Sequence, residues 1–329
     1  MRKPVLIIEP ICKSGSPVSE RIKAYKSFLT NYSIDFETIR TPESIFELFC
    51  LIKCIYIKKF EFLLLSMPPF KNWILCFLPG VKVILDIRDG WSIAMKLGYG
   101  NTVKKRPYRM WLARLIERYS IKSSALTVTV TYGLQDYLKK ISGQSNVLFV
   151  PNGYAQSDQE WVKKFKSKRS DMSAVRYICA GKFTEYGRKK AEKIIQEIKN
   201  RHPNEVVNVD LYGLDKQKNV WLKNWGSETL NITLYDHYPR EELLKEICKA
   251  DYGIVAVRDE TYEYGTKIFD YIMCKIPLFT IIDLKIKNVE YFWDIFLNPD
   301  DPEIVRQYSR EFQFEKNKDS FLCLLKEGK

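Results

Sequence analysis

This chain of 329 residues contains very little histidine and no closely spaced pair of cysteines. Its two histidines are His202 and His237, and none of its eight cysteines stands in a Cys-x-x-Cys arrangement. Structural zinc sites take four Cys or His ligands from such clusters, so the sequence gives little support to a metal site. Scattered cysteines among apolar residues are typical of core positions in a reducing compartment. We therefore expect a cytoplasmic protein without a bound metal.

The sequence also lacks an uncharged apolar run of the roughly 18 residues that a transmembrane helix needs. Its longest candidate, residues 72–85, is interrupted by Pro79, Gly80 and Lys82. The apolar stretch near the N-terminus is too short for a signal peptide, and we interpret it as a buried strand. No repeat of 20–50 residues is visible, which argues against solenoids and propellers.

Positive charge is abundant and unevenly placed. The chain has 53 Lys and Arg against 40 Asp and Glu, a formal net charge of +13. Residues 1–150 hold 23 of the basic residues but only 11 of the acidic ones, so nearly all of the excess lies in this half. No zinc-finger, basic-zipper or RRM-type signature accompanies it, so we expect no nucleic-acid partner. The first half is instead expected to meet another anionic surface or ligand.

Short apolar runs alternate with helical patterns along the whole chain, which is typical of βαβ units with a parallel sheet. The chain is long enough for two domains with separate cores. We predict an α/β fold of two Rossmann-like domains facing across a cleft. The predicted divisions are residues 1–155, a linker at 156–172, and residues 173–329, whose final helix is expected to return to the first domain.

The pattern also predicts the individual elements. Strands are expected at 5–9, 36–39, 62–66, 81–87, 125–131 and 147–151, and then at 175–180, 206–212, 232–235, 252–257, 278–282 and 295–297. Helices are expected at 18–31, 43–54, 106–120, 133–141, 188–199, 216–225, 240–249 and 265–275. Ligands bind beyond the carboxyl ends of the strands in such sheets, so polar residues that follow strands are the candidates for a site.

The segment 262–277 combines a turn, an amphipathic helix and a following apolar strand. Gly265 and Thr266 can bring backbone N–H groups close to an anion at the start of the helix. Lys267 adds a positive charge there, and Asp270 lies three residues on, on the same side of the helix. This pattern suits a nucleotide, with its phosphates on the turn and its ribose on the carboxylate. The alternative is an ordinary turn with solvated charges.

A second candidate follows the strand predicted at 175–180. Residues 181–190 contain two glycines together with Lys182, Arg188 and Lys189, and lead into a helix. Glycine turns with basic side chains suit a diphosphate. The alternative is a basic helix N-terminus without a ligand, which the helix dipole makes slightly unfavourable. We favour the phosphate interpretation.

In the first domain, Asp86, Arg88 and Asp89 end the strand predicted at 81–87. Such a group can fix an acceptor hydroxyl or a donor sugar. The alternative is an Asp–Arg pair that braces the following loop. We favour an acceptor-side site made by Asp86 and Arg88, with a catalytic role for Asp89, which lies furthest into the loop.

The segment 104–119 predicts a basic amphipathic helix. Its apolar side chains follow helical spacing, and basic side chains lie beside them. Aromatic and basic residues in this arrangement suit an anionic bilayer. The alternative is a helix whose apolar stripe packs on the core. We favour a membrane-facing surface that includes Arg106, Arg109, Trp111 and Arg114.

Four motifs in order resemble those of family-4-like glycosyltransferases, which have the GT-B fold. They are Val-Pro-Asn-Gly at 150–153, Ala-Gly-Lys-Phe at 180–183, the stretch 238–255, and Gly-Thr-Lys-Ile-Phe-Asp-Tyr-Ile at 265–272 with Pro277. The resemblance covers nearly the whole chain. It implies transfer of a sugar from a nucleotide diphosphate donor, with UDP favoured, without a cofactor or metal and with retention of anomeric configuration.

Carried over residue by residue, the resemblance places diphosphate contacts at Lys182 and at Arg188 or Lys189. It matches Asp270 to the Glu that holds the ribose hydroxyls. It also places the loop containing Gly15 where this fold approaches the donor.

The family's pair of glutamates departs from this sequence in one respect. The first glutamate, which meets the donor sugar, stands eight positions before the second, and that position is Tyr262 here. Glu263 lies one position away, and Glu260 is the alternative. We predict that Glu263 acts with Asp89 as the catalytic pair.

The sequence therefore favours a glycosyltransferase that builds a bacterial surface glycan at the inner face of the membrane. Its expected partners are a nucleotide sugar, a glycan or lipid-linked acceptor and an anionic membrane surface. A sugar-nucleotide epimerase of the same fold is one alternative, although it would be expected to be less basic and richer in histidine. A catalytically silent subunit of this fold, supporting a partner, is another.

Overall fold

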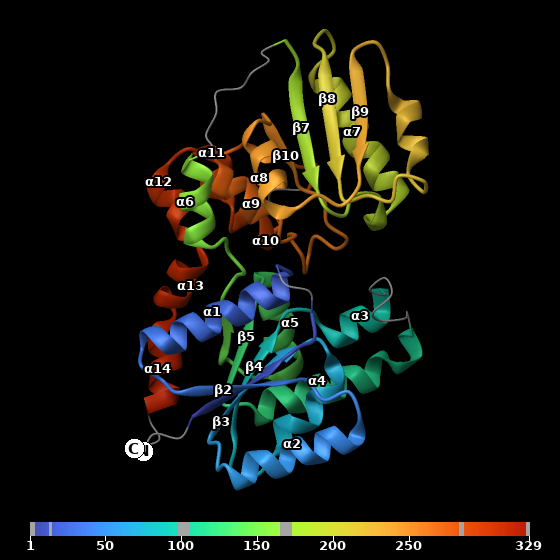
Figure 1. The fold of residues 1–329 in the computed structure, drawn as a ribbon. Coiled ribbons are helices and arrows are strands. Elements are labelled where there is room, and N and C mark those ends of the chain that lie inside the picture. Colours follow the sequence, from blue (N-terminus) through green and yellow to red (C-terminus); the bar gives the residue numbers. More distant parts are fainter. Residues whose placement is uncertain (1–3, 13–14, 98–105, 165–172, 283–285, 327–329) are drawn as a thin grey trace. The chain divides into compact units, whose positions relative to one another are not determined.

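The computed structural model describes residues 4–12, 15–97, 106–164, 173–282 and 286–326. The chain forms two compact units (Figure 1). The first contains the residues up to Pro151 together with those from Phe314 onward, and the second runs from Asn152 to Gln313. Each unit has its own parallel sheet with helices on both faces. The α/β fold class predicted from the sequence is confirmed.

The first unit contains a six-stranded parallel sheet in the order β2-β1-β3-β4-β5-β6. The strands are β1 (Val5–Glu9), β2 (Phe36–Arg40), β3 (Phe62–Met67), β4 (Lys82–Ile87), β5 (Leu126–Thr129) and β6 (Val147–Phe149). Strand β3 is buried along its whole length and pairs with β1 and β4. Its continuous apolar sequence fits this place, because central parallel strands are covered on both faces.

Helices cover both faces of this sheet. They are α1 (Pro17–Asn31), α2 (Ile45–Ile57), η1 (Phe70–Phe77), α3 (Trp91–Leu97), η2 (Pro107–Arg109), α4 (Met110–Ser123), α5 (Tyr132–Ser142) and α14 (Lys318–Lys326). Helix α13 (Arg310–Lys316) contains the boundary between the two units. The crossover from β1 to β2 runs opposite to those that follow. Because such crossovers are right-handed, α1 lies on one face and α2, η1, α4 and α5 lie on the other.

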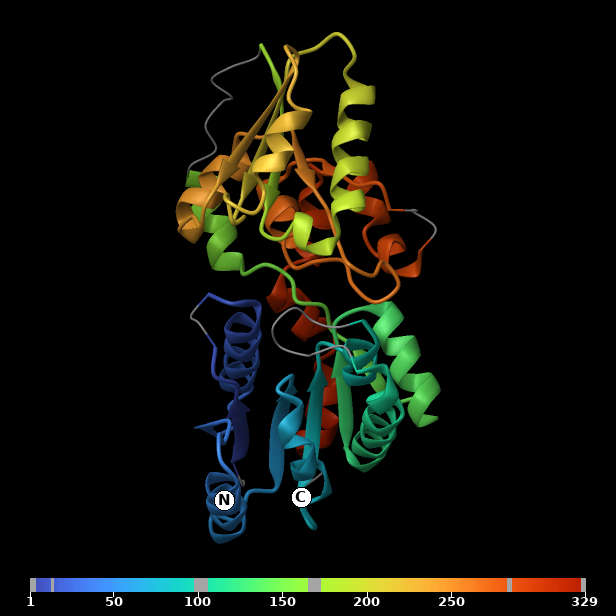
Figure 2. The same cartoon turned by 90° about the vertical axis from the view of Figure 1, so that its right-hand side faces the viewer.

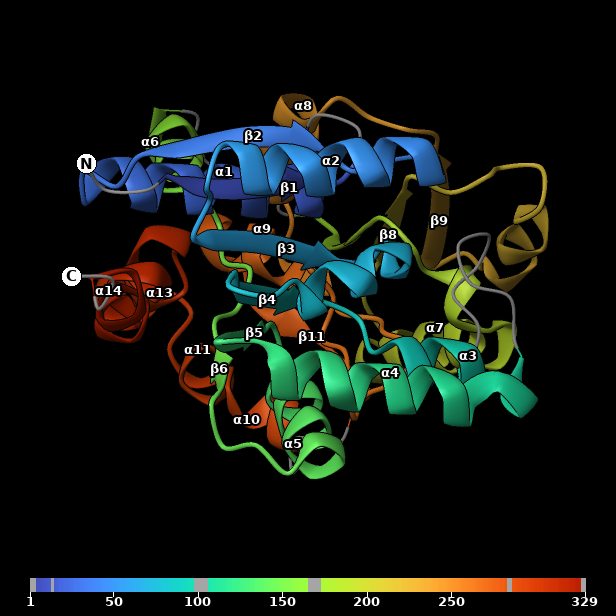
Figure 3. The same ribbon diagram turned by 90° about the horizontal axis from the view of Figure 1, so that it is seen from below.

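The C-terminal helix α14 lies on the α1 side of the first sheet (Figure 2, red), and α4 lies on the opposite side (Figure 3). Phe321 of α14 packs against Tyr25 and Phe28 of α1 and joins the core above the sheet. Helix α1 begins where Ser16 accepts a hydrogen bond from the Ser19 amide at 3.2 Å, with Pro17 in the first turn. This is a common N-cap arrangement.

The second unit has a five-stranded parallel sheet in the order β11-β10-β7-β8-β9. The strands are β7 (Val175–Ala180), β8 (Val207–Tyr212), β9 (Leu230–Tyr235), β10 (Tyr252–Ile254) and β11 (Leu278–Phe279). The helices are α6 (Gln156–Lys164), η3 (Thr184–Tyr186), α7 (Arg188–Arg201), η4 (Val220–Trp225), α8 (Arg240–Cys248), α9 (Ile268–Cys274), α10 (Lys287–Glu290), α11 (Trp293–Leu297) and α12 (Pro302–Gln307).

Helix α9 is the most deeply placed helix of this unit. All seven of its residues are buried, in keeping with the general rule that a helix apolar on every side lies in a core. Its Tyr271 ring packs on Gly253 of β10, where an added Cβ would come within 2.4 Å of the ring. Only glycine leaves room for this contact. Asp270 is the one charged residue carried into this buried helix.

Several predicted elements differ from the structure. Residues 295–297, expected as a strand, belong to helix α11, and residues 216–225 form a turn followed by the short 3-10 helix η4. The helix expected from Gly265 begins only at Ile268. The predicted linker begins as helix α6, whose Val162 joins the second unit's core, and its remaining residues, 165–172, lie outside the described ranges. Within the part of the chain that is described, no helix has the length and apolar character needed to span a bilayer.

Candidate functional site

The carboxyl edge of the second unit's sheet brings together residues that are far apart in the sequence. Gly181 follows β7 and Gly213 follows β8, and both have positive φ angles, +106° and +82°. A Cβ on Gly213 would lie 3.5 Å from the Gly181 Cα, and a Cβ on Gly181 would lie 3.8 Å from the Lys267 side chain. These glycines leave open backbone beside a lysine, which is an arrangement suited to an anion.

The predicted basic residues surround this edge. Lys182, Arg188 and Lys189 are all exposed. Arg188 pairs with Glu192 at 2.9 Å and stacks over the ring of Trp221 with its guanidinium carbon 4.4 Å from the ring centre. The structure therefore leaves these cations at the surface, where a diphosphate can reach them.

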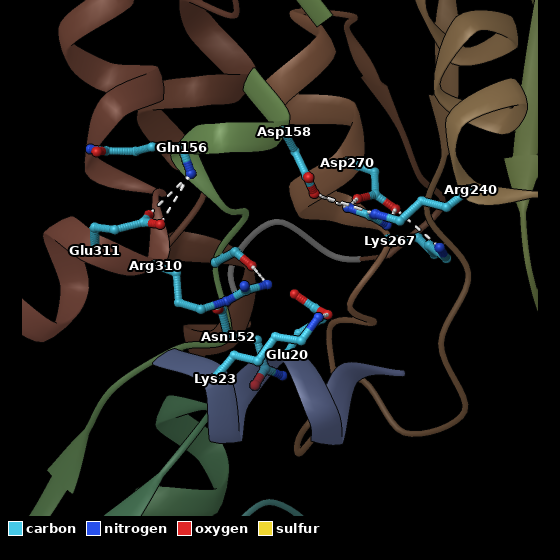
Figure 4. Close-up of polar contacts among 11 residues, drawn as sticks. Glu20, Lys23, Asn152, Gln156, Asp158, Arg240, Lys267, Asp270, Arg310 and Glu311 are labelled. Carbon is cyan, nitrogen blue, oxygen red and sulfur yellow. Dashed lines mark hydrogen bonds and ion pairs between the residues drawn. The ribbon is translucent and has the colours of Figure 1, made fainter. Parts of the chain in front are cut away.

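Asp270 lies beside Lys267 and is almost fully buried, with 5% of its surface exposed. Lys267 Nζ donates to its carboxylate at 3.1 Å, and Arg240 donates to it at 3.0 Å (Figure 4). Burial acts to raise the pKa of Asp270, but the two cations outweigh burial and hold this pKa below its ordinary value. Asp270 is thus an anion held between two cations, and Lys267 remains 39% exposed.

Arg240 is a member of this group that the sequence did not identify. It opens helix α8 and bridges two carboxylates, Asp270 on α9 and Asp158 on α6, the second at 2.7 Å. Its position in the sequence could have predicted a place in the site, because Arg240 comes directly after Tyr238-Pro239, and these residues follow β9 at the same sheet edge. The bridge fixes the linker helix α6 to the helix that carries Asp270.

The loop after β10 carries Gly265, Thr266 and Glu263. Lys190 of α7 holds this loop by donating to the Val257 carbonyl at 2.9 Å and pairing with Glu260 at 3.0 Å. Glu263 is half-buried near Tyr186, whose pKa is raised to about 12 by burial and, secondarily, by the Glu263 charge. Gly265 has a φ of +73° and, with Thr266, forms the turn that precedes α9.

A cluster of tyrosines lies at the carboxyl ends of β8 and β9, at the same edge. Tyr212 and Tyr235 stack with ring centres 4.3 Å apart, and Tyr238 meets Tyr212 edge-on at 5.1 Å. Tyr238 is exposed. This cluster was not predicted, since single tyrosines at strand ends give no periodic signal. His237, beside it, is also exposed.

In the first unit, Asp86 has a structural environment. It is fully buried and accepts hydrogen bonds from Arg21 at 2.7 Å and 2.9 Å, from Tyr25 at 3.3 Å and from Ser66 at 3.2 Å. Arg21 also donates to the Val150 carbonyl at 2.9 Å. The acceptor-side role expected for Asp86 is therefore wrong, because its oxygens are used inside the core to tie α1 to β4.

Arg88 and Asp89 follow Asp86 at the end of β4. Arg88 donates to the Ser66 hydroxyl at 3.2 Å and to the Pro68 carbonyl at 2.6 Å, and burial lowers its pKa. Arg88 thus braces the loop after β3, whereas the alternative interpretation had an Asp–Arg pair bracing the loop after β4. Asp89 is half-buried at the start of the loop.

The loop after Asp89 is anchored from helix α4. Glu117 of α4 accepts hydrogen bonds from the Trp91 amide, from the Ser92 amide at 3.2 Å and from the Ser92 hydroxyl. The Tyr137 hydroxyl lies 2.5 Å from that of Ser92. Burial raises the pKa of Glu117 to about 7. This carboxyl therefore caps helix α3 directly after the loop that contains Asp89.

Helix α4 presents its apolar stripe to solvent. Its buried residues are Ala113, Glu117, Ser120 and Ile121, whereas Trp111 is 65% exposed. The interpretation in which the stripe packs on the core is therefore wrong. Arg109 and Arg114 are also exposed and Arg106 is half-buried, so three predicted cations lie at this surface, while Lys104 and Lys105 lie outside the described residues.

Gly15 has a φ of +75° in the turn before α1, and an added Cβ would meet no atom within 4 Å. Among the residues that the structure describes, no group of three or more His, Cys, Asp or Glu side chains is arranged to hold a metal ion.

Comparison with known proteins identifies the architecture. No family model and no curated protein matches the chain. A glycosyltransferase from Rickettsia africae ESF-5 has a similar structure, with a TM-score of 0.61 and 11% identity over 99% of both chains. Sucrose-phosphate synthase from Thermosynechococcus elongatus also gives a TM-score of 0.61, with 10% identity over 99% of both chains.

A third similar structure is the UDP-GlcNAc 2-epimerase from Neisseria meningitidis bound to UDP-GlcNAc. Its TM-score is 0.53 and its identity 12%, over 97% of this chain and 99% of the other. The likeness to all three extends over both units. Together with the two parallel sheets, these similarities show that the chain has the GT-B fold predicted from its sequence.

Proposed function

We propose that this chain is a glycosyltransferase that moves a sugar from a nucleotide diphosphate donor, with UDP favoured, to a glycan or lipid-linked acceptor. The observation that carries this proposal is the group formed by Gly181, Lys267, Asp270 and Arg240 at the carboxyl edge of the second sheet. Open backbone and a half-exposed lysine there suit phosphate oxygens. The similar structures include proteins in complex with UDP or UDP-GlcNAc, which supports this choice of donor.

The roles proposed for single residues follow from this geometry. Lys182, with Arg188 or Lys189, contacts the diphosphate together with Lys267 and the Gly265–Thr266 backbone. Asp270 keeps Lys267 in place and offers its remaining lone pairs to the ribose hydroxyls.

The base is proposed to lie beside Tyr238. An exposed aromatic ring supported by two stacked tyrosines gives a rigid surface on which a base can stack, and aromatic stacking contributes about 1–3 kcal/mol per base.

The catalytic groups proposed are Asp89, toward the acceptor, and Glu263, toward the donor sugar, with Gly15 near the donor. The transfer is proposed to retain the anomeric configuration and to need no metal, as the resemblance to family-4-like enzymes implies. The product would be a bacterial surface polysaccharide, made at the inner face of the membrane.

Membrane contact is proposed for the α4 surface. Arg109, Trp111 and Arg114 are exposed together there, with Arg106 at the preceding turn. Aromatic side chains suit the headgroup boundary and basic side chains suit anionic lipid.

The proposal is tested by titrating the purified protein with UDP, GDP, ADP and CMP, and then by assaying hydrolysis and transfer from the matching nucleotide sugars. A ligand at a hundred times its Kd raises the apparent stability by about 2.7 kcal/mol, which thermal unfolding detects. We expect one nucleoside diphosphate to stabilise the protein and its sugar to be transferred with and without chelator. Absence of stabilisation by all four nucleotides would contradict the proposal.

An epimerase is the second candidate, because UDP-GlcNAc 2-epimerases are among the similar structures. The two functions differ in one measurement. An epimerase converts UDP-GlcNAc to its 2-epimer without an acceptor, whereas a transferase leaves the sugar configuration of unused donor unchanged. NMR of the donor after incubation with the protein alone distinguishes them.

A further inference from the structure

Helix α2 exposes an apolar face that the proposed function does not use. Only Leu51 and Ile55 of its thirteen residues are buried, while Phe46 is 76% exposed and Phe49 is 66% exposed. Glu47 and Lys53 are its only charged residues. A helix as apolar as this one is normally buried, and a large exposed apolar patch marks a site of interaction.

This face continues across two neighbouring elements. Helix α2, η1 and α4 lie on the same face of the first unit's sheet (Figure 3). The Tyr56 hydroxyl at the end of α2 donates to the Pro79 carbonyl just after η1, at 3.1 Å. Helices η1 and α4 pack directly against each other. The three elements are thus held side by side by direct contacts.

Most of the exposed large apolar side chains of the described residues lie on this one face, twelve of seventeen. They are Ile45, Phe46, Phe49, Tyr56 and Ile57 of α2, Ile74 and Phe77 of η1, and Tyr108, Trp111, Leu112, Leu115 and Tyr119 of η2 and α4. This concentration makes the face an interaction surface rather than a scatter of single exposed residues.

The charges around the face identify what covers it. The exposed acidic residues on or next to the three elements are Glu43 and Glu47, and Glu37 of β2 pairs with Lys58. Eight exposed basic side chains accompany them: Lys53, Lys58, Lys59, Lys71, Arg109, Arg114, Arg118 and Lys122. A second copy of the chain, docked by two-fold symmetry, would bring these like charges together and be repelled. An anionic lipid surface attracts them and accepts the apolar side chains.

We propose that α2 is an apolar anchor whose Phe46 and Phe49 insert between the lipid chains of an anionic bilayer, while the cations of α4 contact the headgroups. This inference deepens the membrane contact included in the proposed function. It adds that one component of membrane binding, the insertion of apolar side chains, is not removed by salt. Buried aromatic side chains are not screened, whereas the attraction of exposed cations falls off within a Debye length.

The test compares vesicle binding by the full-length protein at two salt concentrations. Vesicles of phosphatidylcholine with phosphatidylglycerol are sedimented at ~0.1 M and ~0.5 M salt. The variant combines Phe46→Ser and Phe49→Ser, and a matched control, Leu297→Ser, removes an exposed apolar side chain from the second unit. Burying one large apolar side chain contributes about 1.5–3 kcal/mol, so the loss of two lowers the partition coefficient roughly a hundredfold or more.

We expect the wild-type protein and the Leu297→Ser control to stay partly bound at high salt, and the double variant to be released. Exposed Cys50 on α2 gives a second readout. With Cys12→Ser and Cys323→Ser in place, a polarity-sensitive fluorescent dye is attached to Cys50. Its emission should shift to shorter wavelength on vesicles, and lipids that carry a quencher in their acyl chains should reduce it.

Three results would overturn the inference. The double variant could keep its salt-resistant binding, the wild-type protein could be released completely by salt, or the dye on Cys50 could remain in water. A lipid-free dimer in sedimentation velocity that the double variant abolishes would assign the face to a second copy instead. Nucleotide binding by the second unit is measured separately. Failure of the anchor therefore leaves the proposed enzymatic function standing. Absence of nucleotide binding by the wild-type protein would reject that function alone.

Discussion

The guanidinium of Arg240 donates to the buried carboxylate of Asp270 at 3.0 Å and at the same time to Asp158 at 2.7 Å. Removing Arg240 leaves the buried carboxylate of Asp270 with Lys267 as its cationic partner, so part of its charge compensation is lost. We predict that Arg240→Ala lowers the free energy of unfolding by about 3 kcal/mol or somewhat less, since Arg240 is itself one-third exposed. Urea unfolding monitored by tryptophan fluorescence measures this loss.

The same pair offers a built-in control. Adding Asp270→Asn to Arg240→Ala removes the buried charge that has lost one of its two cations, so part of the lost stability should return. Lys218→Ala, which breaks an exposed pair with Asp215, should change stability by less than about 1 kcal/mol. An Arg240→Ala protein as stable as the Lys218→Ala protein would contradict the importance of this bridge.

Lys182 gives the most direct test of the diphosphate site. It is exposed beside the Gly181 turn, so its removal should not disturb folding. A charge-assisted hydrogen bond contributes about 1.5–3 kcal/mol, and Lys182→Ala should therefore weaken nucleoside diphosphate binding roughly ten- to a hundredfold. Isothermal titration measures the change. Lys193→Ala, an exposed lysine further along α7, should bind nucleotide like the wild-type protein. Equal affinity of both variants would remove Lys182 from the site.

The proposed catalytic pair predicts a separation between turnover and binding. Asp89→Asn and Glu263→Gln keep the size of each side chain but remove its charge. Each should lower kcat, by a factor on the order of 10²–10⁴ for a general acid or base, and leave nucleotide affinity nearly unchanged. Steady-state kinetics measure kcat, and nucleotide titration measures the affinity of each variant. Wild-type kcat in both variants would assign the chemistry to other residues.

Glu117 predicts a pH dependence of stability. Burial raises its pKa to about 7, above its value of about 4.3 in an unfolded chain. Its contribution to stability is therefore fully present below the unfolded pKa and is lost as the pH rises through the folded one. Because Glu117 is buried, the loss between about pH 5 and pH 8 should be on the order of 2–3 kcal/mol.

The matched variant for this prediction is Glu117→Gln, which shares every other titratable group with the wild-type protein. Its unfolding free energy, followed by urea denaturation across the same pH range, should lack this component of the decline. Parallel curves for the two proteins would show that Glu117 does not titrate in this window. Because Glu117 caps α3 next to the Asp89 loop, kcat of the Gln variant is a useful accompanying measurement.

Local sequence patterns were enough to predict the two sheets. Buried parallel strands are mostly apolar runs, so β3 and β7 could be located to within a residue or two, although Arg176 interrupts the apolar sequence of β7. The run at 295–297 is just as apolar, yet it lies in a helix. Short apolar runs do not distinguish a strand from a buried helical turn, and only the packing of the finished fold decides.

The orientation of side chains was harder to predict than the elements that carry them. Periodicity identified the apolar stripe of α4, but it does not show whether this stripe faces the core or the surface. The opposite face is buried instead, because the small Ala113 and Ser120 allow close packing and the buried Glu117 is satisfied by α3. The bridge from Arg240 to Asp270 joins residues thirty positions apart, and no local pattern contains it.

The cations beside α4 give the last prediction. Each basic residue near an anionic membrane contributes about 1 kcal/mol. Replacing Arg106, Arg109 and Arg114 by Glu should therefore lower binding to anionic vesicles at ~0.1 M salt by roughly a hundredfold or more. Three equivalent reversals on the second unit, Lys193→Glu, Lys199→Glu and Lys223→Glu, change the net charge equally but should leave retention nearly unchanged. Vesicle sedimentation measures both. Equal loss of vesicle binding in the two triple variants would show that net charge alone governs binding. Equal retention of the wild-type protein on neutral and anionic vesicles would leave these arginines without a lipid-binding role.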